Sequence, residues 1–214
     1  MRKVEFDRDR VLDRAMDVFR EKGYSDASIE DLTAATGLRR SSLYNTFIGK
    51  RELYLAALRR YHARCTEQYA LVECSPEPAR AVCELVRSVI TEELEDTRGL
   101  GCMVANAALE FAGREDEIRA LTSYNLSSMA ATVATGVRRG QELGQVDPAV
   151  DSEAFARSVV VTVQGLRVAA KALTVQQRSE WLESAADACL APLLDVAQPG
   201  VDRSCADAAE VADN

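Results

Sequence analysis

The 214-residue sequence has no long hydrophobic segment. A helix needs roughly 18 or more consecutive apolar residues to cross a bilayer, and the absence of such a run argues against a membrane span. The N-terminus, Met-Arg-Lys followed by mixed charges, also lacks the apolar stretch of a secretory signal. We therefore expect a cytoplasmic protein.

Residues suited to acid–base catalysis or metal binding are scarce. His62 is the single histidine, and the six cysteines include no C-x-x-C pair. Neither a zinc site nor a disulfide framework is expected, and no cofactor is predicted. The sequence also has no Ser/His/Asp or Cys/His arrangement and no glycine loop of the kind that binds phosphate, so a helical enzyme is the weakest functional hypothesis. We interpret His62 as a surface or packing residue.

The net charge of −8 argues at first against a nucleic-acid partner. The charge is unevenly distributed, however, because residues 1–60 contain 13 Lys/Arg and 10 Asp/Glu, whereas the remainder contains 13 and 24. Electrostatic steering depends on the local field rather than on the total charge. A mildly basic N-terminal part on an acidic body would therefore approach DNA head-first.

A short stretch, residues 28–47, predicts two helices joined by a tight turn. Ser28 and Asp31 form the S-x-x-[DE] capping signature at the start of the first helix. Gly37 can adopt the positive φ that ends a helix without Cβ strain, and a second helix can begin within three or four residues. This spacing is that of a helix-turn-helix.

The second of these helices has an apolar and a polar side. Leu43, Tyr44 and Phe47 lie on one side, and the other side is small, polar and uncharged after two arginines. Such a face suits a DNA major groove, where short polar side chains reach base edges and arginines reach guanines or phosphates. The alternative is an ordinary exposed helix in a protein that never binds DNA. The candidate DNA-binding residues are Ser28, Arg39, Arg40, Ser41, Ser42, Tyr44, Asn45, Thr46 and Lys50.

Further residues around this motif form a recognisable pattern. They are Gly37-Leu38, Leu43-Tyr44-Asn45-Thr46-Phe47 and Lys50-Arg51-Glu52-Leu53, preceded by Phe19 and Gly23-Tyr24. This pattern, within residues 7–61, resembles the N-terminal domain of TetR-type (TetR/AcrR) bacterial transcriptional repressors. The resemblance implies an all-α fold, in which an N-terminal three-helix helix-turn-helix domain binds DNA and a C-terminal helical domain binds a ligand and dimerises.

Two positions differ from the family pattern. Arg39 stands where the family has a small capping residue, which puts the cap of the recognition helix in doubt and adds positive charge at the DNA face. Ile48-Gly49 replaces a Pro or Gly followed by a small polar residue. We expect this second exchange to be harmless.

The remaining sequence predicts further helices, about nine in all. A fourth helix begins near Lys50, and Ser75-Pro76-Glu77-Pro78 marks a boundary. The fourth helix would run from the DNA-binding head into the body, either as a rod that carries a signal or as a mere connector. The predicted domains are a helix-turn-helix domain at 1–49 (recognition motif 29–48), an effector-binding and dimerisation domain at 50–197, and a disordered acidic tail at 198–214.

The last two predicted helices, 152–173 and 176–196, carry more apolar surface than one chain can cover. Apolar residues nearly encircle the first of them between 159 and 168, which requires burial on more than one side. Two such helices from each of two chains would form a four-helix bundle, as in TetR-type dimers. The candidate interface residues are Phe155, Val159, Val160, Val163, Trp181, Leu182, Ala185 and Cys189.

The predicted central helices, at about 79–143, offer the mixture of apolar and occasional polar residues that small-molecule sites use. Each candidate also fits the role of a plain core residue. The candidate effector-binding residues are Val86, Ile90, Cys102, Met103, Asn106, Tyr124, Met129 and Gln164.

Cys102 stands out because it begins a predicted helix behind a glycine-flanked turn and near Arg98. Unpaired N–H dipoles and a nearby cation would favour a reactive sulfur. The Gly-Cys-Met-Val-x-Asn-x-Ala-x-Glu run resembles the corresponding run of TetR-type sensors of electrophiles and oxidants. An inert buried cysteine is the competing interpretation.

These observations predict a homodimeric repressor on an inverted-repeat operator of double-stranded DNA. An effector of unknown identity, either a small molecule or an electrophile that reacts at Cys102, would release it by changing the spacing of the two heads. The alternatives are a dimeric helical scaffold without DNA binding and, last, a helical enzyme.

Overall fold

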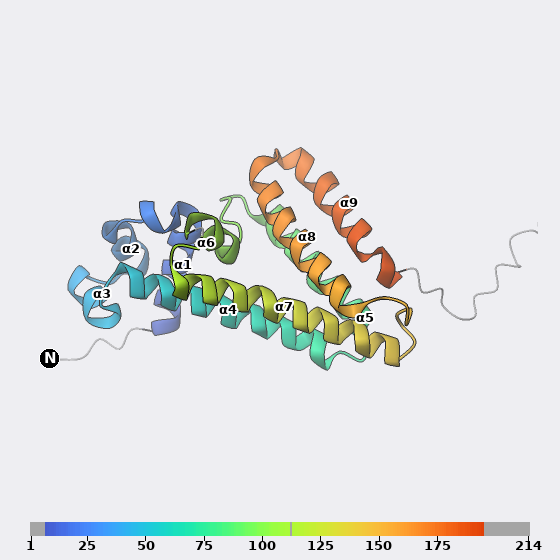
Figure 1. Cartoon of the computed structure of the whole chain (residues 1–214). Helices are drawn as coiled ribbons and strands as arrows, with labels where there is room; N and C mark the ends of the chain where they lie inside the picture. Colours follow the sequence, from blue (N-terminus) through green and yellow to red (C-terminus); the bar gives the residue numbers. More distant parts are fainter. Residues whose placement is uncertain (1–6, 112, 195–214) are drawn as a thin grey trace, which may run out of the picture.

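A computed structural model of the chain describes residues 7–111 and 113–194. The described residues form nine helices and no strand (Figure 1), which confirms the predicted all-α class. The tail predicted at 198–214 lies outside them. The helices are α1 (Arg8–Asp26), α2 (Ile29–Thr36), α3 (Arg40–Phe47), α4 (Lys50–Cys74), α5 (Pro78–Glu95), α6 (Met103–Phe111), α7 (Asp116–Glu142), α8 (Ser152–Ala172) and α9 (Val175–Leu194).

The helices form a small head and a longer body (Figure 1). Helices α1, α2 and α3 lie at one end, and the long helices α4 and α7 run side by side from this head into the body. There α5 packs against both of them, α8 packs against α7, and α9 packs on α5 and α8. Helix α4 ends at Cys74 and α5 begins at Pro78, so the boundary predicted at residues 75–78 is confirmed.

Two hydrophobic cores hold the fold together. The body core is formed by α5, α7, α8 and α9 with the C-terminal part of α4. The head core contains the apolar side of α1, the helix-turn-helix residues Leu32, Leu43 and Phe47, and also Met103 of α6 and Ile118 of α7. Burying each such large side chain contributes about 1.5–3 kcal/mol. Helix α6 is therefore fixed to the DNA-binding head by packing, although the chain reaches it only after α5.

The helix-turn-helix forms as its local sequence predicts. Ser28 Oγ accepts the Asp31 N–H at 3.0 Å, and the Asp31 carboxylate accepts the Ser28 N–H at 3.0 Å, which confirms the capping box. Gly37 ends α2 in the left-handed region at φ 72°. Arg39 occupies the N-cap position of α3 and makes no side-chain capping hydrogen bond.

The sequence predicts that the first helix ends before Gly23, but α1 extends beyond this residue. The helix continues to Asp26, but Gly23 has φ 79° and ψ 176° and interrupts it. A kink of this kind removes the intrahelical partners of the next N–H groups. The amides of Tyr24 and Ser25 therefore require acceptors from elsewhere.

The turn after α3 is strained. Ile48 has φ 67° and ψ −37°, and the Gly49 N–H donates to the Phe47 carbonyl at 2.7 Å across it. This is the geometry of a γ-turn with positive φ, which is rare and costly for a β-branched residue. The presence of isoleucine at position 48, where the family pattern has Pro or Gly, therefore has an energetic cost that the sequence context does not reveal.

We predict that Ile48→Gly stabilises the protein. The side chain is 81% exposed, so its removal loses little packing, whereas relief of positive-φ strain should raise the free energy of unfolding by about 1 kcal/mol. Thermal unfolding should show a midpoint about 2–4 °C higher. Ile48→Ala is the matched control, because it removes the β-branch but keeps Cβ. Equal midpoints for Ile48→Gly and the unmodified chain would contradict the strain.

Candidate functional site

One exposed face of the head collects most of the candidate DNA-binding residues. Leu43 and Phe47 are buried and fix the orientation of α3. Tyr44 is 39% exposed, rather than packed with those two side chains. The residues Arg39, Arg40, Ser41 and Asn45 are exposed, and Ser42 and Thr46 are half-buried. This face is polar and weakly basic, as a groove-reading helix requires.

Arg40 is held only loosely. Its guanidinium lies 3.2 Å from the Glu30 carboxylate, with both side chains exposed, and 5.9 Å from the centre of the Tyr44 ring. Exposed ion pairs of this kind contribute about 0–1 kcal/mol. Arg40 can therefore exchange Glu30 for a phosphate or a base edge.

Two candidates instead have roles inside the head. Ser28 is occupied by its capping box. The Lys50 ammonium donates to the carbonyls of Ser25 and Ala27, at 3.2 and 2.9 Å, and lies 4.5 Å from the centre of the Tyr24 ring. Lys50 thus stabilises the connection between α1 and α2.

The kinked end of α1 is held by Glu110 of α6. The Glu110 carboxylate accepts the N–H groups of Tyr24 and Ser25, at 2.7 and 2.6 Å. Burial raises the pKa of Glu110, but these hydrogen bonds and the Lys50 charge outweigh it and lower the pKa below its ordinary value. The charged carboxylate is thus the form that joins α6 to the head.

A second set of hydrogen bonds joins α1 to the loop before α6. Arg20 Nε donates to the Gly101 carbonyl at 2.8 Å. The Asn106 amide donates to the carbonyls of Arg20 and Leu100, at 3.2 and 3.1 Å, and accepts from Lys171 of α8 at 3.0 Å. Asn106, a candidate effector-binding residue, therefore connects α1, the loop and α8.

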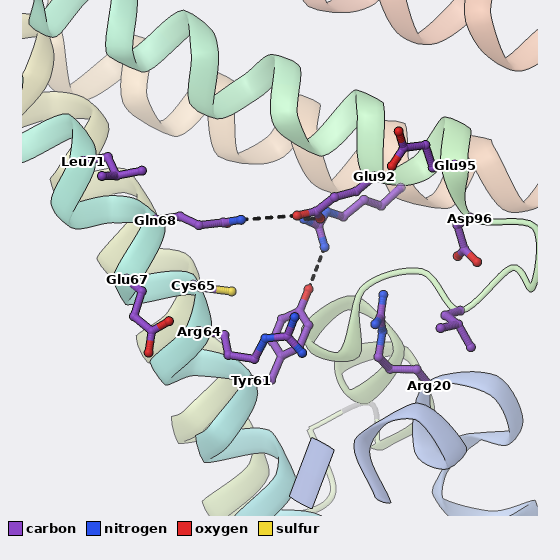
Figure 2. A pocket seen from close by; sticks show the side chains of 12 residues that line it. Arg20, Tyr61, Arg64, Cys65, Glu67, Gln68, Leu71, Glu92, Glu95 and Asp96 are labelled. Carbon is purple, nitrogen blue, oxygen red and sulfur yellow. Dashed lines mark hydrogen bonds and ion pairs between the residues drawn. The ribbon is translucent and has the colours of Figure 1, made fainter. Parts of the chain in front are cut away.

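A cavity of about 610 Å³ opens beside this loop, between α1, α4, α5 and α8 (Figure 2). In Figure 2, Tyr61, Cys65 and Gln68 project from α4 toward Glu92 of α5, and Arg20 enters from α1. The lining residues are Arg20, Tyr61, Arg64, Cys65, Glu67, Gln68, Leu71, Glu92, Glu95, Asp96, Leu100 and Arg167.

Sequence reasoning missed this lining because it sought apolar positions on the central helices. Val86, Ile90 and Met129 lie in the body core, and Met103 lies in the head core. Gln164 is half-buried on α8 with no hydrogen-bond partner for Oε1. Tyr124 is exposed, and its ring lies tilted against that of His62 with 4.8 Å between the ring centres, beside a smaller hollow of about 270 Å³. The charged lining residues carried no signal, because they fit an ordinary solvated face.

Cys102 lies just before α6 and is 3% exposed. Its sulfur accepts a hydrogen bond from the Tyr61 hydroxyl at 3.4 Å, and that oxygen accepts from Arg167 Nη1 at 2.7 Å. Burial raises the pKa of Tyr61 well above its ordinary value, so the phenol keeps its proton. Arg98, the cation expected near Cys102, pairs instead with Asp17 and Glu21.

Cys65 is the cysteine that lines the cavity. Burial raises the pKa of its thiol to about 11, so it is protonated and weakly nucleophilic at neutral pH.

The candidate interface residues fall into two groups. Phe155, Val159, Val160, Val163 and Leu182 are buried within the chain, and Val159 and Leu182 have no exposed surface. Trp181 is 57% exposed, Ala185 is exposed and Cys189 is half-buried. The exposed apolar surface of α8 is formed instead by Val161 and Val168.

Two other features are absent from residues 7–111 and 113–194. In this part of the chain, no helix is long and apolar enough to cross a bilayer. The same residues contain no group of three or more His, Cys, Asp or Glu side chains placed to hold a metal ion.

Comparison with known proteins finds matches to a single protein family along most of the chain. Residues 11–57 match the model of bacterial regulatory proteins of the tetR family, and residues 78–186 match the tetracyclin repressor-like C-terminal domain. The uncharacterized HTH-type transcriptional regulator YezE of Bacillus subtilis is 29% identical over 150 residues, which cover 68% of this chain and 76% of YezE.

Two further proteins extend the comparison. The HTH-type transcriptional repressor ComR of Escherichia coli is 26% identical over 78% of this chain and 80% of its own length. A cysteine variant of the regulator CifR, solved with a 26-bp operator, is 31% identical, covers 87% of this chain and 99% of its own, and superposes with a TM-score of 0.74. The family and these relatives are transcriptional regulators, not enzymes. With both family models matched and this geometry in the head, the chain belongs to the TetR family of DNA-binding transcriptional regulators.

Proposed function

We propose that the protein is a homodimeric repressor that binds an inverted-repeat operator and leaves it when an effector occupies the cavity. The position of Arg20 is the observation that supports the effector role of the cavity. Its side chain lines the cavity, and it belongs to α1, which packs against α2 and shares the head core with α3. A ligand in the cavity would therefore contact the head directly.

The exposed polar face of α3 supports the DNA part of the proposal. In a twofold dimer, the two recognition helices enter successive major grooves about 34 Å apart. Arg39 and Arg40 would contact phosphates or guanines, and Asn45 and Ser41 would reach base edges. The operator complex of the related CifR is consistent with this mode.

The exposed apolar residues of α8 and α9 support the dimer. Val161, Val168 and Trp181 are each at least half exposed in the single chain. Their backbones lie in adjacent packed helices. Because contiguous exposed apolar surface marks interaction sites, we place the centre of the interface on these residues with Ala185.

The signal would pass through the loop before α6. A ligand that displaces Arg20 would disturb its bond to the Gly101 carbonyl, and through α6 the contact of Glu110 with Tyr24 and Ser25. A coupling free energy of about 1–3 kcal/mol would weaken operator binding roughly 5- to 150-fold. Of the two roles open to α4, the rod that carries a signal is favoured, because Tyr61 and Cys65 of α4 line the same cavity.

A second candidate function is the sensing of electrophiles or oxidants at Cys102. The Tyr61 hydroxyl bridges this sulfur to Arg167, which lines the cavity. Modification of the sulfur would break the bridge and disturb the start of α6. Its 3% exposure favours the competing interpretation of an inert core cysteine.

We predict that Arg40→Ala and Tyr44→Ala each weaken operator binding about 5- to 100-fold without changing the dimer, because each removes a contact that the complex alone makes. Gel-shift titration with the DNA upstream of the reading frame measures the affinity, and sedimentation velocity measures the dimer. Arg80→Ala is the control, since Arg80 is exposed at the start of α5 in the body. Unchanged affinity in both variants would place the DNA face elsewhere, and failure of any operator to bind would favour a scaffold.

We predict that Glu110→Gln lowers the free energy of unfolding by about 1–3 kcal/mol, because a neutral amide replaces a carboxylate that accepts two N–H groups. The loss should be largest above the ordinary carboxyl pKa of 4.5. It should shrink as the pH falls below that value toward the lower folded pKa, because the native carboxylate then becomes protonated. Urea unfolding of both proteins from pH 7 to pH 3 measures this difference.

Glu142→Gln is the matched control, because it removes the same charge at an exposed position at the C-terminal end of α7. A pH-independent difference between Glu110→Gln and the unmodified chain would contradict the role of the Glu110 charge.

We predict that Cys102→Ser makes operator binding resistant to a quinone or to hypochlorite if Cys102 is the sensor. Gel shifts before and after treatment measure release, and Cys65→Ser is the control for the other cysteine near Tyr61. Equal release from Cys102→Ser and the unmodified chain would leave Cys102 as a packing residue.

A further inference from the structure

We propose that the cavity binds a small organic molecule with a single carboxylate, and that the buried guanidinium of Arg167 is its principal partner. This inference rests on the proposed role of the cavity as the effector site and names the chemical class of the ligand.

Arg167 is a cation held at the inner wall of the cavity. Its residue is 8% exposed, and its Nη1 donates to the Tyr61 hydroxyl at 2.7 Å. Its Nε is buried and has no hydrogen-bond partner among the described residues. A buried charge with an unpaired donor costs free energy unless an acceptor forms a hydrogen bond with that donor. The cavity wall therefore presents a permanent positive charge with unused hydrogen-bonding capacity.

The acidic neighbours of Arg167 satisfy it poorly. Glu92 Oε2 lies 3.5 Å from Nη2, and Glu93 Oε1 lies 4.0 Å from Nε. Hydrogen bonds between a guanidinium and a carboxylate are normally about 2.7–2.9 Å long. Burial also raises the pKa of Glu93, although the Arg167 charge opposes this shift. Arg167 thus has no carboxylate at the usual hydrogen-bond length in this arrangement.

Glu92 is the neighbour that a ligand can replace. Its side chain is about half exposed, and its other oxygen accepts from Gln68 at 3.3 Å across the cavity (Figure 2). A carboxylate bound at hydrogen-bond distance from Arg167 would displace Glu92 toward solvent, where its charge is well hydrated. Displacement would also break the contact between α4 and α5 that Gln68 and Glu92 make.

The charges of the lining disfavour a ligand with two negative charges. Four carboxylates, from Glu67, Glu92, Glu95 and Asp96, face three guanidinium groups, from Arg20, Arg64 and Arg167. A phosphate dianion would be repelled by the acidic rim, whereas one carboxylate matches one buried guanidinium. Leu100, Cys65 and the Tyr61 ring leave apolar surface for the rest of the ligand, and about 610 Å³ is a usual volume for such a site.

The test is direct binding of propionate, hexanoate and benzoate to the purified full chain, measured by titration calorimetry against the three matching amides and inorganic phosphate. We expect at least one carboxylate to bind about tenfold or more tightly than its amide and, at pH 8, than phosphate. The amide is neutral and phosphate is then mainly a dianion, so only the carboxylate brings a single charge to Arg167. Binding of every amide as tightly as its acid would overturn the proposal, and so would binding of none of the three acids.

Variants assign the binding to Arg167. Arg167→Met should weaken carboxylate binding tenfold or more, while Glu92→Gln should strengthen it about three- to tenfold, because it removes the competing internal carboxylate. Arg80→Met and Glu84→Gln, on the exposed side of α5, are the matched charge controls and should leave the affinity unchanged. Weaker binding in Glu92→Gln would overturn the displacement. If Arg167→Met has no cooperative thermal transition and is therefore unfolded, the carboxylate affinity of Glu92→Gln decides the proposal.

Gel shifts separate this inference from the proposed function. Intact operator binding without carboxylate binding overturns only the ligand class. Carboxylate binding that leaves operator affinity unchanged supports the ligand class and overturns the effector role of the cavity.

Discussion

The connection between α6 and the DNA-binding head depends on one carboxylate that joins two distant parts of the chain. Glu110 accepts the N–H groups of Tyr24 and Ser25, which the interruption of α1 at Gly23 leaves without intrahelical partners. The Tyr24, Tyr54 and Phe111 rings pack around this contact with centroids 5.1–5.5 Å apart. Because α1 packs against α2 and α6 and shares the head core with α3, α6 contributes to the position of the recognition helix.

The cavity borders the loop that leads into α6, because Asp96 and Leu100 of this loop line it. Arg20 and Leu100 line it, and both are bonded to the segment that leads into α6, through Gly101 and Asn106. In addition to the dimer surface proposed on α8 and α9, the body therefore has a direct connection to the DNA-binding head. Any molecule that rearranges the cavity acts on residues one or two contacts away from Glu110. This short connection is the physical basis for regulation of DNA binding in our account.

The sequence predicts those parts of the fold that depend on neighbours in the chain. The Ser28 capping box, the left-handed Gly37 and the boundary before Pro78 each follow from residues within a few positions. The Glu110 contact spans 86 residues, so no periodicity could reveal it. The cavity was missed for a different reason, since its lining is charged and resembles solvated helix faces. The strain at Ile48 depends on a backbone angle that composition does not specify.

The most direct test of this account is amide hydrogen exchange in the free dimer, with and without Glu110→Gln. The contact predicts slow exchange at Tyr24 and Ser25 in the unmodified chain. In Glu110→Gln, exchange should accelerate at these two amides and through α2 and α3, while α9 is unaffected. Unchanged exchange in α2 and α3 would contradict the claim that α6 positions the recognition helix.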